Sequence, residues 1–546
     1  MCTTVAVLPA VVAVVQMLRR DWAPIADDGI ILLRAHDVLS GDTPALGQLS
    51  IASFATGADT RSMGPAAYWP FALTARFGPM WLTPVLAGVL SALGLALIVH
   101  LAGRRGGLPL MASTTVGLVL VLRAVGTVNL AEVWNPSVAL VPMVLLLFLG
   151  WSLGSGERGW LPLTVLVASF VAQAHITYVV AALGMLVVSV AAGYGPLALA
   201  LWRRRRGGED DDAPVLDTRV EVRRLGLAVA VAGVLWALPL AQQLRGDPGN
   251  ITLLSRSTSD GAAGWWFSAR VIARSVGVIP VFLRDMPDSW GFYEHLPGEG
   301  WSLATATTLL VVLALGAVVV VAGRRRSDLA VAAALVLVAL AGALVTLRST
   351  PSDHRIFSVL YTGWWVVAYG MLAWLVLLAV GLRIGARAGA ARTVPAWVRP
   401  AGAGLAVAVA AAVALSTPVH DREAMLYPLG DEVADAVVAE GVDGQAVMIE
   451  GGGGAGVQMG PAIAYRVHRA GGRPVLAGYD GRSAGPDHVG AGRRCDAVIR
   501  IAADHPPEPA VAGERTLLVA PVPPNPEIEA ERLYVTIAPD TAAPSC

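Results

Sequence analysis

Residues 329–347 read LAVAAALVLVALAGALVTL, an apolar run without a single charged side chain. A helix rises about 1.5 Å per residue, so about 20 apolar residues are enough to cross the hydrocarbon layer of a membrane. Similar runs recur along the 546 residues, of which 55% are hydrophobic and only 15% charged. Ordinary soluble domains carry about 25% charged residues. The sequence therefore predicts a polytopic α-helical membrane protein.

Eleven runs have the length and composition of a membrane span, and together they predict a transmembrane domain over residues 1–417. The first run lacks a positively charged leader and is followed by Arg19 and Arg20, so we expect it to remain as a span. The uncharged stretch 161–201 is long enough for two spans, with a turn near His175 to Tyr178. The predicted spans are 2–18, 79–101, 108–124, 136–153, 161–179, 180–201, 225–241, 301–322, 329–347, 356–382 and 401–417.

The arginines predict the orientation of these spans. All 40 basic residues are arginine, because the chain contains no lysine. Successive loops lie on alternate sides of the membrane. The loops on one side hold 17 arginines in about 60 residues, whereas those on the other side hold 13 in more than twice that length. Cytoplasmic loops are enriched in basic residues. We therefore expect a cytoplasmic N-terminus, a cytoplasmic linker over 202–224 and an external loop over 19–78. The arginine-rich loops are 102–107, 154–160, 202–224, 323–328 and 383–400.

Residues 418–546 differ from the rest in composition, with more polar residues, proline and glycine and no further span. Residues 447–450 have the pattern of a strand, 451–454 of a glycine loop, 461–470 of a helix, and 474–476 of a second strand. This order predicts a small α/β domain on the extracytoplasmic side.

The three cysteines, Cys2, Cys495 and Cys546, show no CxxC spacing, so the sequence gives no indication of a cysteine-based zinc or redox site. Cys495 and Cys546 both belong to the C-terminal domain. They would pair in an oxidising compartment and remain free in a reducing one.

Two adjacent carboxylates, Asp27 and Asp28, follow the first span directly. Apolar and polar residues alternate with helical spacing over 30–38, which predicts an amphipathic helix along the membrane surface. One of the two acids would then be its N-cap, which stabilises a helix by about 1 kcal/mol. A cap explains one carboxylate but not both. A carboxylate in the first turn is also favoured as the anion, which suits a base or a metal ligand.

The same loop continues with further polar residues in a recognisable order. Asp27-Asp28-Gly29 is followed by Arg34, by Ser40-Gly41-Asp42, and then by a proline-aromatic segment over Gly64–Pro70. This arrangement resembles the GT-C class of integral membrane glycosyltransferases, in particular the branch of lipid A aminoarabinose transferases and protein O-mannosyltransferases. The resemblance covers this loop and the layout of about eleven spans followed by an external domain. It includes no motif in the C-terminal domain.

The resemblance implies an inverting single displacement. A sugar would pass from a polyprenyl-phosphate donor to an extracytoplasmic glycan, lipid or protein acceptor. Asp27 would be the catalytic base, with Asp28 as its helper. Glu132 occupies the position of the family's second acidic site, so Asp27 and Glu132 would share a divalent cation, Mg²⁺ or Mn²⁺. A single Glu without a paired acid departs from the family pattern, and Glu132 is alternatively an exposed loop acid beside Trp134.

A second external loop, residues 348–355, carries Arg348, His354 and Arg355. A guanidinium binds phosphate oxygens in bidentate geometry and remains charged in a medium of low dielectric constant. We expect these three residues to bind the donor phosphate. The alternative is that their side chains extend to water from the membrane boundary.

Four further residues are candidates for contact with the acceptor: Arg34, His36, Asn135 and His175. Polar residues near the end of a span are costly unless they face the protein interior or a cavity, so His175 is alternatively a structural histidine.

Two other functions remain open: a transporter or flippase of lipid-linked glycans, and a non-catalytic membrane scaffold. Transporters usually carry charges or broken helices at the membrane midplane, whereas the runs predicted here are almost free of charge. Nothing indicates nucleic acid as a partner, and the expected location is the cell membrane. The absence of lysine and the abundance of Ala, Val, Gly and Arg are typical of a GC-rich, actinobacterial genome, in which such transferases build cell-wall polysaccharide.

Overall fold

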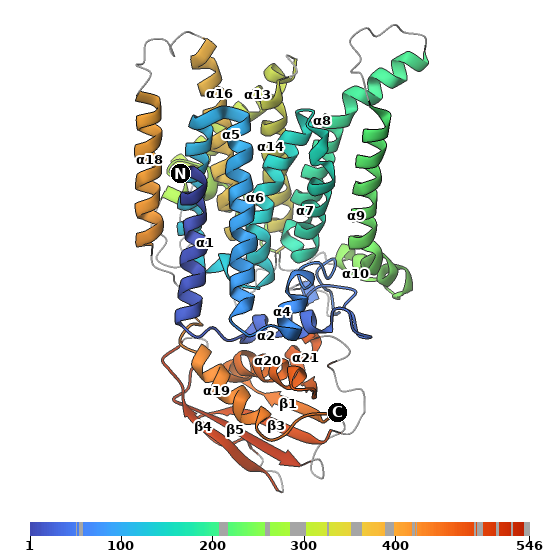
Figure 1. Cartoon of the computed structure of the whole chain (residues 1–546), viewed down its shortest axis with the longest axis vertical. Helices are drawn as coiled ribbons and strands as arrows, with labels where there is room; N and C mark the ends of the chain where they lie inside the picture. The colour runs from blue at the N-terminus through green and yellow to red at the C-terminus, as the bar shows by residue number, and fades with distance from the viewer. Residues whose placement is uncertain are drawn as a thin grey trace.

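The computed structural model comprises a bundle of long helices with a mixed α/β domain at one end (Figure 1). Helices α2 (Ala26–Asp37) and α4 (Ala72–Phe77) lie between the two parts. The prediction of a polytopic helical membrane protein with a small C-terminal sheet domain is confirmed. The structure describes residues 1–50, 52–53, 58–206, 217–256, 262–283, 302–324, 327–350, 363–387, 398–417, 421, 423–484, 488, 495–508, 513–525 and 528–539.

Every predicted span contains a helix. Among the residues described, nine helical segments are long and apolar enough to cross a membrane. Two shorter apolar helices, α7 and α18, accompany them. Part of the predicted linker, residues 207–216, lies outside the described residues. The helices of the bundle are α1 (Cys2–Arg19), α5 (Leu82–Val125), α6 (Asn135–Gly154), α7 (Leu161–Ala174), α8 (Val179–Arg205), α9 (Thr218–Arg245), α11 (Gly264–Val276), α13 (Leu303–Arg324), α14 (Asp328–Arg348), α16 (Val366–Arg387) and α18 (Val398–Ser416).

Two breaks in these helices agree with the predicted turns. Helix α5 loses its helical backbone at Gly106 and Gly107, where φ of Gly107 is +62°, so its two halves correspond to the predicted spans 79–101 and 108–124. Glycine adopts positive φ without steric cost. The extended backbone of His175 separates α7 from α8, at the turn predicted within the stretch 161–201.

The predicted spans leave residues 242–300 as a loop, but part of this stretch is helical. Helix α11 packs into the bundle against α13, α14 and α16. Trp374 Nε1 donates to the carbonyl of Val276 at 2.8 Å, and a Cβ on Gly370 would lie 1.9 Å from the carbonyl oxygen of Ser275. The hydropathy pattern missed α11 because Arg270 and Arg274 interrupt its apolar residues.

The C-terminal domain contains a five-stranded sheet in the order β2-β1-β3-β5-β4. Strand β1 is parallel to β2 and β3, whereas β5 is antiparallel to β3 and β4. The predicted strand–helix–strand order is confirmed. The elements of the domain are α19 (Tyr427–Val438), β1 (Ala446–Gly451), α20 (Gly453–Arg469), β2 (Arg473–Leu476), α21 (Gly478–Ala484), β3 (Ala497–Ala503), β4 (Arg515–Pro521) and β5 (Arg532–Pro539).

The predicted boundary between glycine loop and helix is wrong, because α20 already begins at Gly453. A Cβ on Gly451 would lie 2.4 Å from the Cα of Gly456. These glycines therefore let the first turn of α20 pass directly over the end of β1. The helix-breaking tendency of glycine is outweighed by this close packing.

Helix α2 lies between the bundle and the C-terminal domain and is almost wholly buried by protein (Figure 1). Residues 28–35 are all buried, because the C-terminal domain covers the polar side of the helix. A Cβ on Gly29 would lie 2.7 Å from the main-chain carbon of Pro461, so α2 and α20 approach closely at this point. The alternation of polar and apolar residues in α2 therefore reflects its two interfaces, one with the helix bundle and one with the C-terminal domain.

Cys495 is disulfide-bonded, whereas Cys2 is free and buried. Cys546, its predicted partner, lies outside the described residues.

Candidate functional site

Asp27 and Asp28 lie in the first turn of α2, but neither caps it. The N-cap is Ile25, and no side chain accepts a capping hydrogen bond there. The interpretation of one acid as a helix cap is therefore wrong. The carboxylate of Asp27 instead accepts two hydrogen bonds from other segments, one from Gln48 Nε2 at 2.8 Å and one from Trp134 Nε1 at 2.9 Å.

Asp27 is accessible to solvent, although protein surrounds its carboxyl group. The residue is exposed, yet burial of the carboxyl raises its pKa, which the hydrogen bonds from Trp134 and Gln48 partly offset. Asp27 is therefore reachable by a ligand in an environment where charge is weakly screened.

Four further carboxyl groups lie near Asp27, and we refer to all five as the acidic cluster. Asp28 belongs to α2, and Glu132 precedes α6. Asp421 and Glu423 come from the segment that joins α18 to the C-terminal domain. Glu132 accepts a hydrogen bond from Ser137 Oγ at 3.0 Å. The cluster thus brings residues that follow the first helix of the bundle together with residues that follow its last helix, α18.

Burial raises the pKa values of all five groups in the acidic cluster. Burial is the largest cause in each case. The charges of Glu132, Asp27 and Asp421 raise the pKa of Asp28 further. Burial and Asp421 raise the pKa of Glu132 to about 8. Burial, followed by the charge of Asp28, raises the pKa of Glu423 well above its usual range. At neutral pH the cluster therefore retains protons or attracts a cation.

The indole of Trp134 connects Asp27 with the helix that follows the predicted phosphate-binding loop. The rings of Trp134 and Trp364 are 6.0 Å apart, and Trp364 immediately precedes α16. His354 and Arg355 lie outside the described residues. The guanidinium of Arg348 stacks on Trp265, 4.4 Å from the ring centroid.

Asn135 and His175, two of the predicted acceptor-binding residues, each have a structural partner. Asn135 Nδ2 donates to the carbonyl of Ala174 at 3.0 Å. His175 Nδ1 lies 2.8 Å from the Thr177 hydroxyl and accepts from the Thr177 amide at the break between α7 and α8. These contacts hold the end of α6 against that break.

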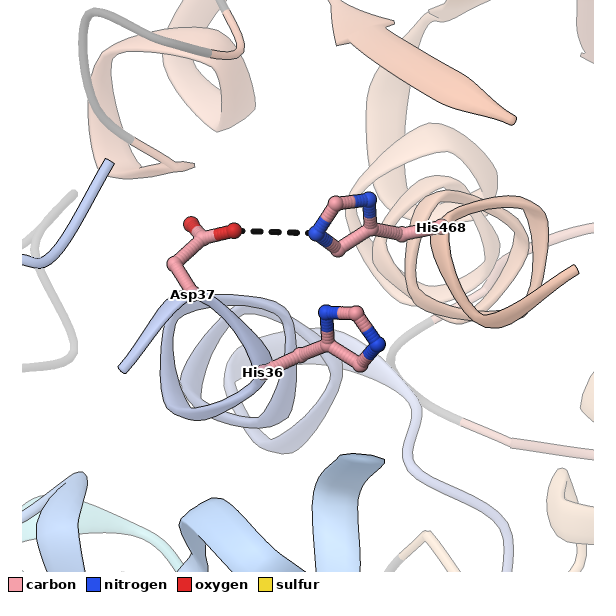
Figure 2. Close-up of side chains that lie close together, drawn as sticks. All are labelled: His36, Asp37 and His468. Carbon is pink, nitrogen blue, oxygen red and sulfur yellow. Dashed lines mark hydrogen bonds and ion pairs between the residues drawn. The ribbon is translucent and has the colours of Figure 1, made fainter. Parts of the chain in front are cut away.

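The far end of α2 carries a second polar group of side chains, which includes two of the predicted acceptor-binding residues. Figure 2 shows His36 and Asp37 of α2 facing His468 of α20. The rings of His36 and His468 are 4.2 Å apart, edge to face. Burial and the charge of His468 lower the pKa of His36 to about 4. Its ring is therefore neutral at neutral pH.

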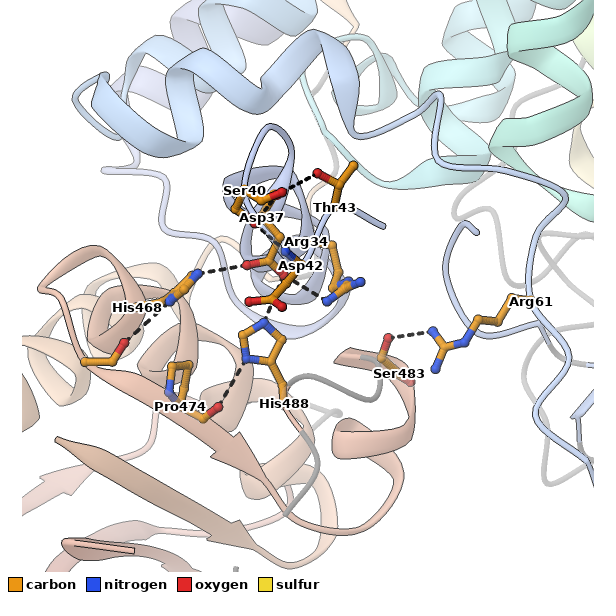
Figure 3. Close-up of polar contacts among 11 residues, drawn as sticks. Arg34, Asp37, Ser40, Asp42, Thr43, Arg61, His468, Pro474, Ser483 and His488 are labelled. Carbon is orange, nitrogen blue, oxygen red and sulfur yellow. Dashed lines mark hydrogen bonds and ion pairs between the residues drawn. The ribbon is translucent and has the colours of Figure 1, made fainter. Parts of the chain in front are cut away.

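Asp37 is the centre of this second group, which we call the Asp37 network: Arg34, Asp37, His468 and His488 (Figure 3). Arg34 Nη1 donates to Oδ2 of Asp37 at 2.8 Å. His468 Nε2 lies 2.9 Å from Oδ1, and His488 Nε2 lies 3.0 Å from Oδ2. Burial alone would raise the pKa of Asp37, but the hydrogen bonds from both histidines hold it well below its usual range. Arg34 and His36 thus face the C-terminal domain.

A groove with a volume of about 1120 Å³ lies between α5, α16 and α18. Its lining is mostly apolar and includes Arg105, beside the break of α5, and Arg383, near the C-terminal end of α16. It is therefore separate from the acidic cluster.

Sequence reasoning missed several residues of both groups. Gln48, Asp421 and Glu423 belong to the surroundings of Asp27, whereas His468 and His488 belong to the Asp37 network. Local spacing in the sequence could not reveal them, because residues such as His468 and Asp37 are 431 positions apart. One signal was present: Asp421 and Glu423 follow the last apolar run directly, as Asp27 and Asp28 follow the first.

No family model, curated protein or solved structure matches the chain.

Proposed function

We propose that the protein is a membrane glycosyltransferase that moves a sugar from a polyprenyl-phosphate donor to an extracytoplasmic acceptor. The observation that carries the proposal is the environment of Asp27. The residue is exposed, its carboxylate is oriented by Gln48 and Trp134, and four further carboxyl groups lie near it at one end of a helix bundle. A purely structural acid would not require such neighbours, because crowded carboxyl groups destabilise the fold.

In the proposed reaction Asp27 acts as the general base. Its carboxylate accepts the proton of the acceptor hydroxyl as that oxygen attacks the anomeric carbon of the donor sugar. The bond between this carbon and the phosphate oxygen breaks, and the polyprenyl phosphate leaves with the electron pair. A single displacement of this kind inverts the anomeric centre. A positioned base typically contributes about 10²–10⁴-fold to the rate.

The hydrogen bonds of Asp27 favour its role over that of its neighbours. Two N–H donors stabilise its anionic form, whereas Asp28 and Glu423 have pKa values raised well above the usual range. A base must be ionised when the acceptor arrives. Asp27 is therefore the proposed base, and Asp28 is a helper that holds a proton beside it.

A divalent cation, Mg²⁺ or Mn²⁺, is compatible with this cluster. Oxygen ligands are the ones that such ions prefer. Asp27 and Glu132 are the proposed ligands, with Asp421 and Glu423 near enough to contribute charge. The ion would offset the mutual repulsion of the carboxylates.

The proposal assigns the donor phosphate to Arg348, His354 and Arg355. Support comes from the contact between Trp134 and Trp364, which brings the start of α16 next to the partner of Asp27. Residues 348–355 precede this helix in the chain. The proposal also assigns the acidic cluster and the C-terminal domain to the outer side of the cell membrane, in line with the arginine distribution.

The test is sugar transfer in membranes that contain the protein. Membranes with the wild-type chain, Asp27→Ala or Asp42→Asn are supplied with radiolabelled polyprenyl-phosphate sugars. Asp42 is a matched control because it is an exposed acid of the same loop. We expect incorporation with the wild type and Asp42→Asn, and none above background with Asp27→Ala at equal protein abundance.

Transfer that survives Asp27→Ala would exclude this residue as the base. Translocation of the intact labelled donor across the membrane, without transfer, would identify a flippase instead. A wild type that performs neither reaction with any of the donors would overturn the proposed function.

A further inference from the structure

A second site is built where α2 meets the C-terminal domain. His36, Asp37 and His468 each offer one ligand atom, and these three atoms lie within 4.8 Å of one another. Figure 2 shows the carboxylate of Asp37 facing the ring of His468 from α20, with the ring of His36 beside that of His468. His488 Nε2 lies 3.0 Å from the other carboxylate oxygen, Oδ2 of Asp37 (Figure 3). The group therefore combines two imidazoles with one carboxylate, and a third imidazole bonds the same carboxylate.

The outer ring nitrogens of two histidines face main-chain carbonyl groups. His488 Nδ1 lies 3.1 Å from the carbonyl of Pro474, and His468 Nδ1 lies 3.4 Å from that of Gly472. A carbonyl oxygen accepts but cannot donate, so each Nδ1 carries the hydrogen. In a neutral ring the lone pair is then on Nε2, which faces the carboxylate of Asp37. Two acceptors approach to about 3 Å only when a proton or a cation lies between them.

A divalent ion can replace the proton between His468 Nε2 and Oδ1 of Asp37. The lone pair of His468 is then used by the ion. Histidines that bind a metal usually donate their other N–H to a carbonyl or carboxylate, which fixes the ring. His468 and His488 already have this orientation.

We propose that His36, Asp37 and His468 bind a transition-metal ion, with Zn²⁺ as the ion they fit best, and that His488 orients the carboxylate of Asp37. Imidazole nitrogen favours zinc and its neighbours in the first row over Mg²⁺ and Ca²⁺. Two histidines and one carboxylate form a known set of protein ligands for zinc, in which water takes the fourth position. Arg34 remains bonded to Oδ2 of Asp37 and neutralises part of the carboxylate charge.

The ion joins two parts of the chain that are far apart in sequence. His36 and Asp37 belong to the loop after the first span, whereas His468 is 431 positions from Asp37. Asp27 is on the same helix, ten residues or roughly 15 Å from Asp37. The ion thus fixes the far end of the helix that presents the acidic cluster. The site stands independently of the glycosyl transfer proposed above.

Metal content tests the site directly. The full chain is purified in detergent, stripped with a chelator, dialysed against ZnCl₂ and analysed by mass spectrometry for zinc. We expect one zinc ion per chain in the wild type and background levels in His36→Ala and His468→Ala. His505→Ala is the control, because His505 is an exposed histidine of the same domain. It should retain the ion.

His36→Ala keeps the test informative if His468→Ala fails to fold, since His36 contacts its neighbours through its ring alone. A titration of the stripped wild type with CoCl₂ gives a second readout, because the visible spectrum of Co²⁺ reports nitrogen and oxygen ligands in tetrahedral geometry. A wild type without stoichiometric zinc, or a His36→Ala variant that binds zinc as the wild type does, would overturn the proposal.

Discussion

The indole Nε1 of Trp134 lies 2.9 Å from Oδ2 of Asp27, although the two residues are 107 positions apart. Trp134 is the N-cap residue of α6, and Asp27 belongs to the first turn of α2. The bond stabilises the ionised carboxylate in a crowded acidic environment. It also connects Asp27 with Trp364 through the contact between the two indole rings.

Trp134→Phe should shift the pH dependence of sugar transfer. Loss of the N–H donor leaves the Asp27 anion less stable, so the pKa of Asp27 rises further. A base is active only when ionised, so the acid limb of the profile moves to higher pH. Transfer falls at neutral pH and recovers as the pH is raised. Initial rates across the pH range provide the measurement, and an unchanged acid limb would mean that the bond does not control the base.

Glu132→Gln should stabilise the protein in alkaline solution. The folded pKa of about 8 exceeds the ordinary value of 4.5. The folded state therefore holds a proton that the unfolded state releases, and stability declines as the pH rises from 4.5 to about 8. A glutamine side chain does not titrate, so the variant avoids this decline in stability. We expect a gain of about 1–3 kcal/mol at pH 8 and little difference at pH 4.5.

Thermal unfolding of Glu132→Gln and wild type at both pH values checks this expectation. If the two proteins keep the same difference in midpoint at pH 4.5 and pH 8, Glu132 does not titrate in this range.

Asp37→Asn should loosen the C-terminal domain. The change leaves the buried Arg34 without its carboxylate and replaces one of the two oxygens that bond His468 and His488 with an NH₂ donor. Breaking a buried ion pair by removing one partner typically costs about 3–5 kcal/mol. We expect a lower unfolding midpoint and faster proteolytic release of residues 418–546. Asp42→Asn, an exposed acid five positions away, should behave as the wild type.

Gly29→Ala should disturb the contact between α2 and α20. The new methyl group would lie 2.7 Å from the main-chain carbon of Pro461, so one of the two helices must shift. Overpacking of this kind costs about 1–3 kcal/mol. The matched control is Gly41→Ala, because nothing lies within 4 Å of a Cβ at that position. Equal unfolding midpoints for the two variants would contradict this packing.

The sequence predicted the membrane helices well because the physical cause is local. A span needs only length and apolar side chains, so the runs in α6, α13 and α14 were evident. The same rule failed for α11, where Arg270 and Arg274 interrupt the apolar pattern and packing against other helices decides the fold. The strands β1 and β2 were predicted for a similar local reason.

The sequence by itself determined a helical membrane protein, a C-terminal α/β region and the pair of acids after the first helix, because composition and periodicity act within about 20 residues. Only the tertiary structure decided what surrounds those acids. It placed Glu423 near Asp28 and both His468 and His488 beside Asp37. No periodicity relates residues hundreds of positions apart. Their meeting depends on the docking of the C-terminal domain onto α2, through contacts that exist only once both parts have folded.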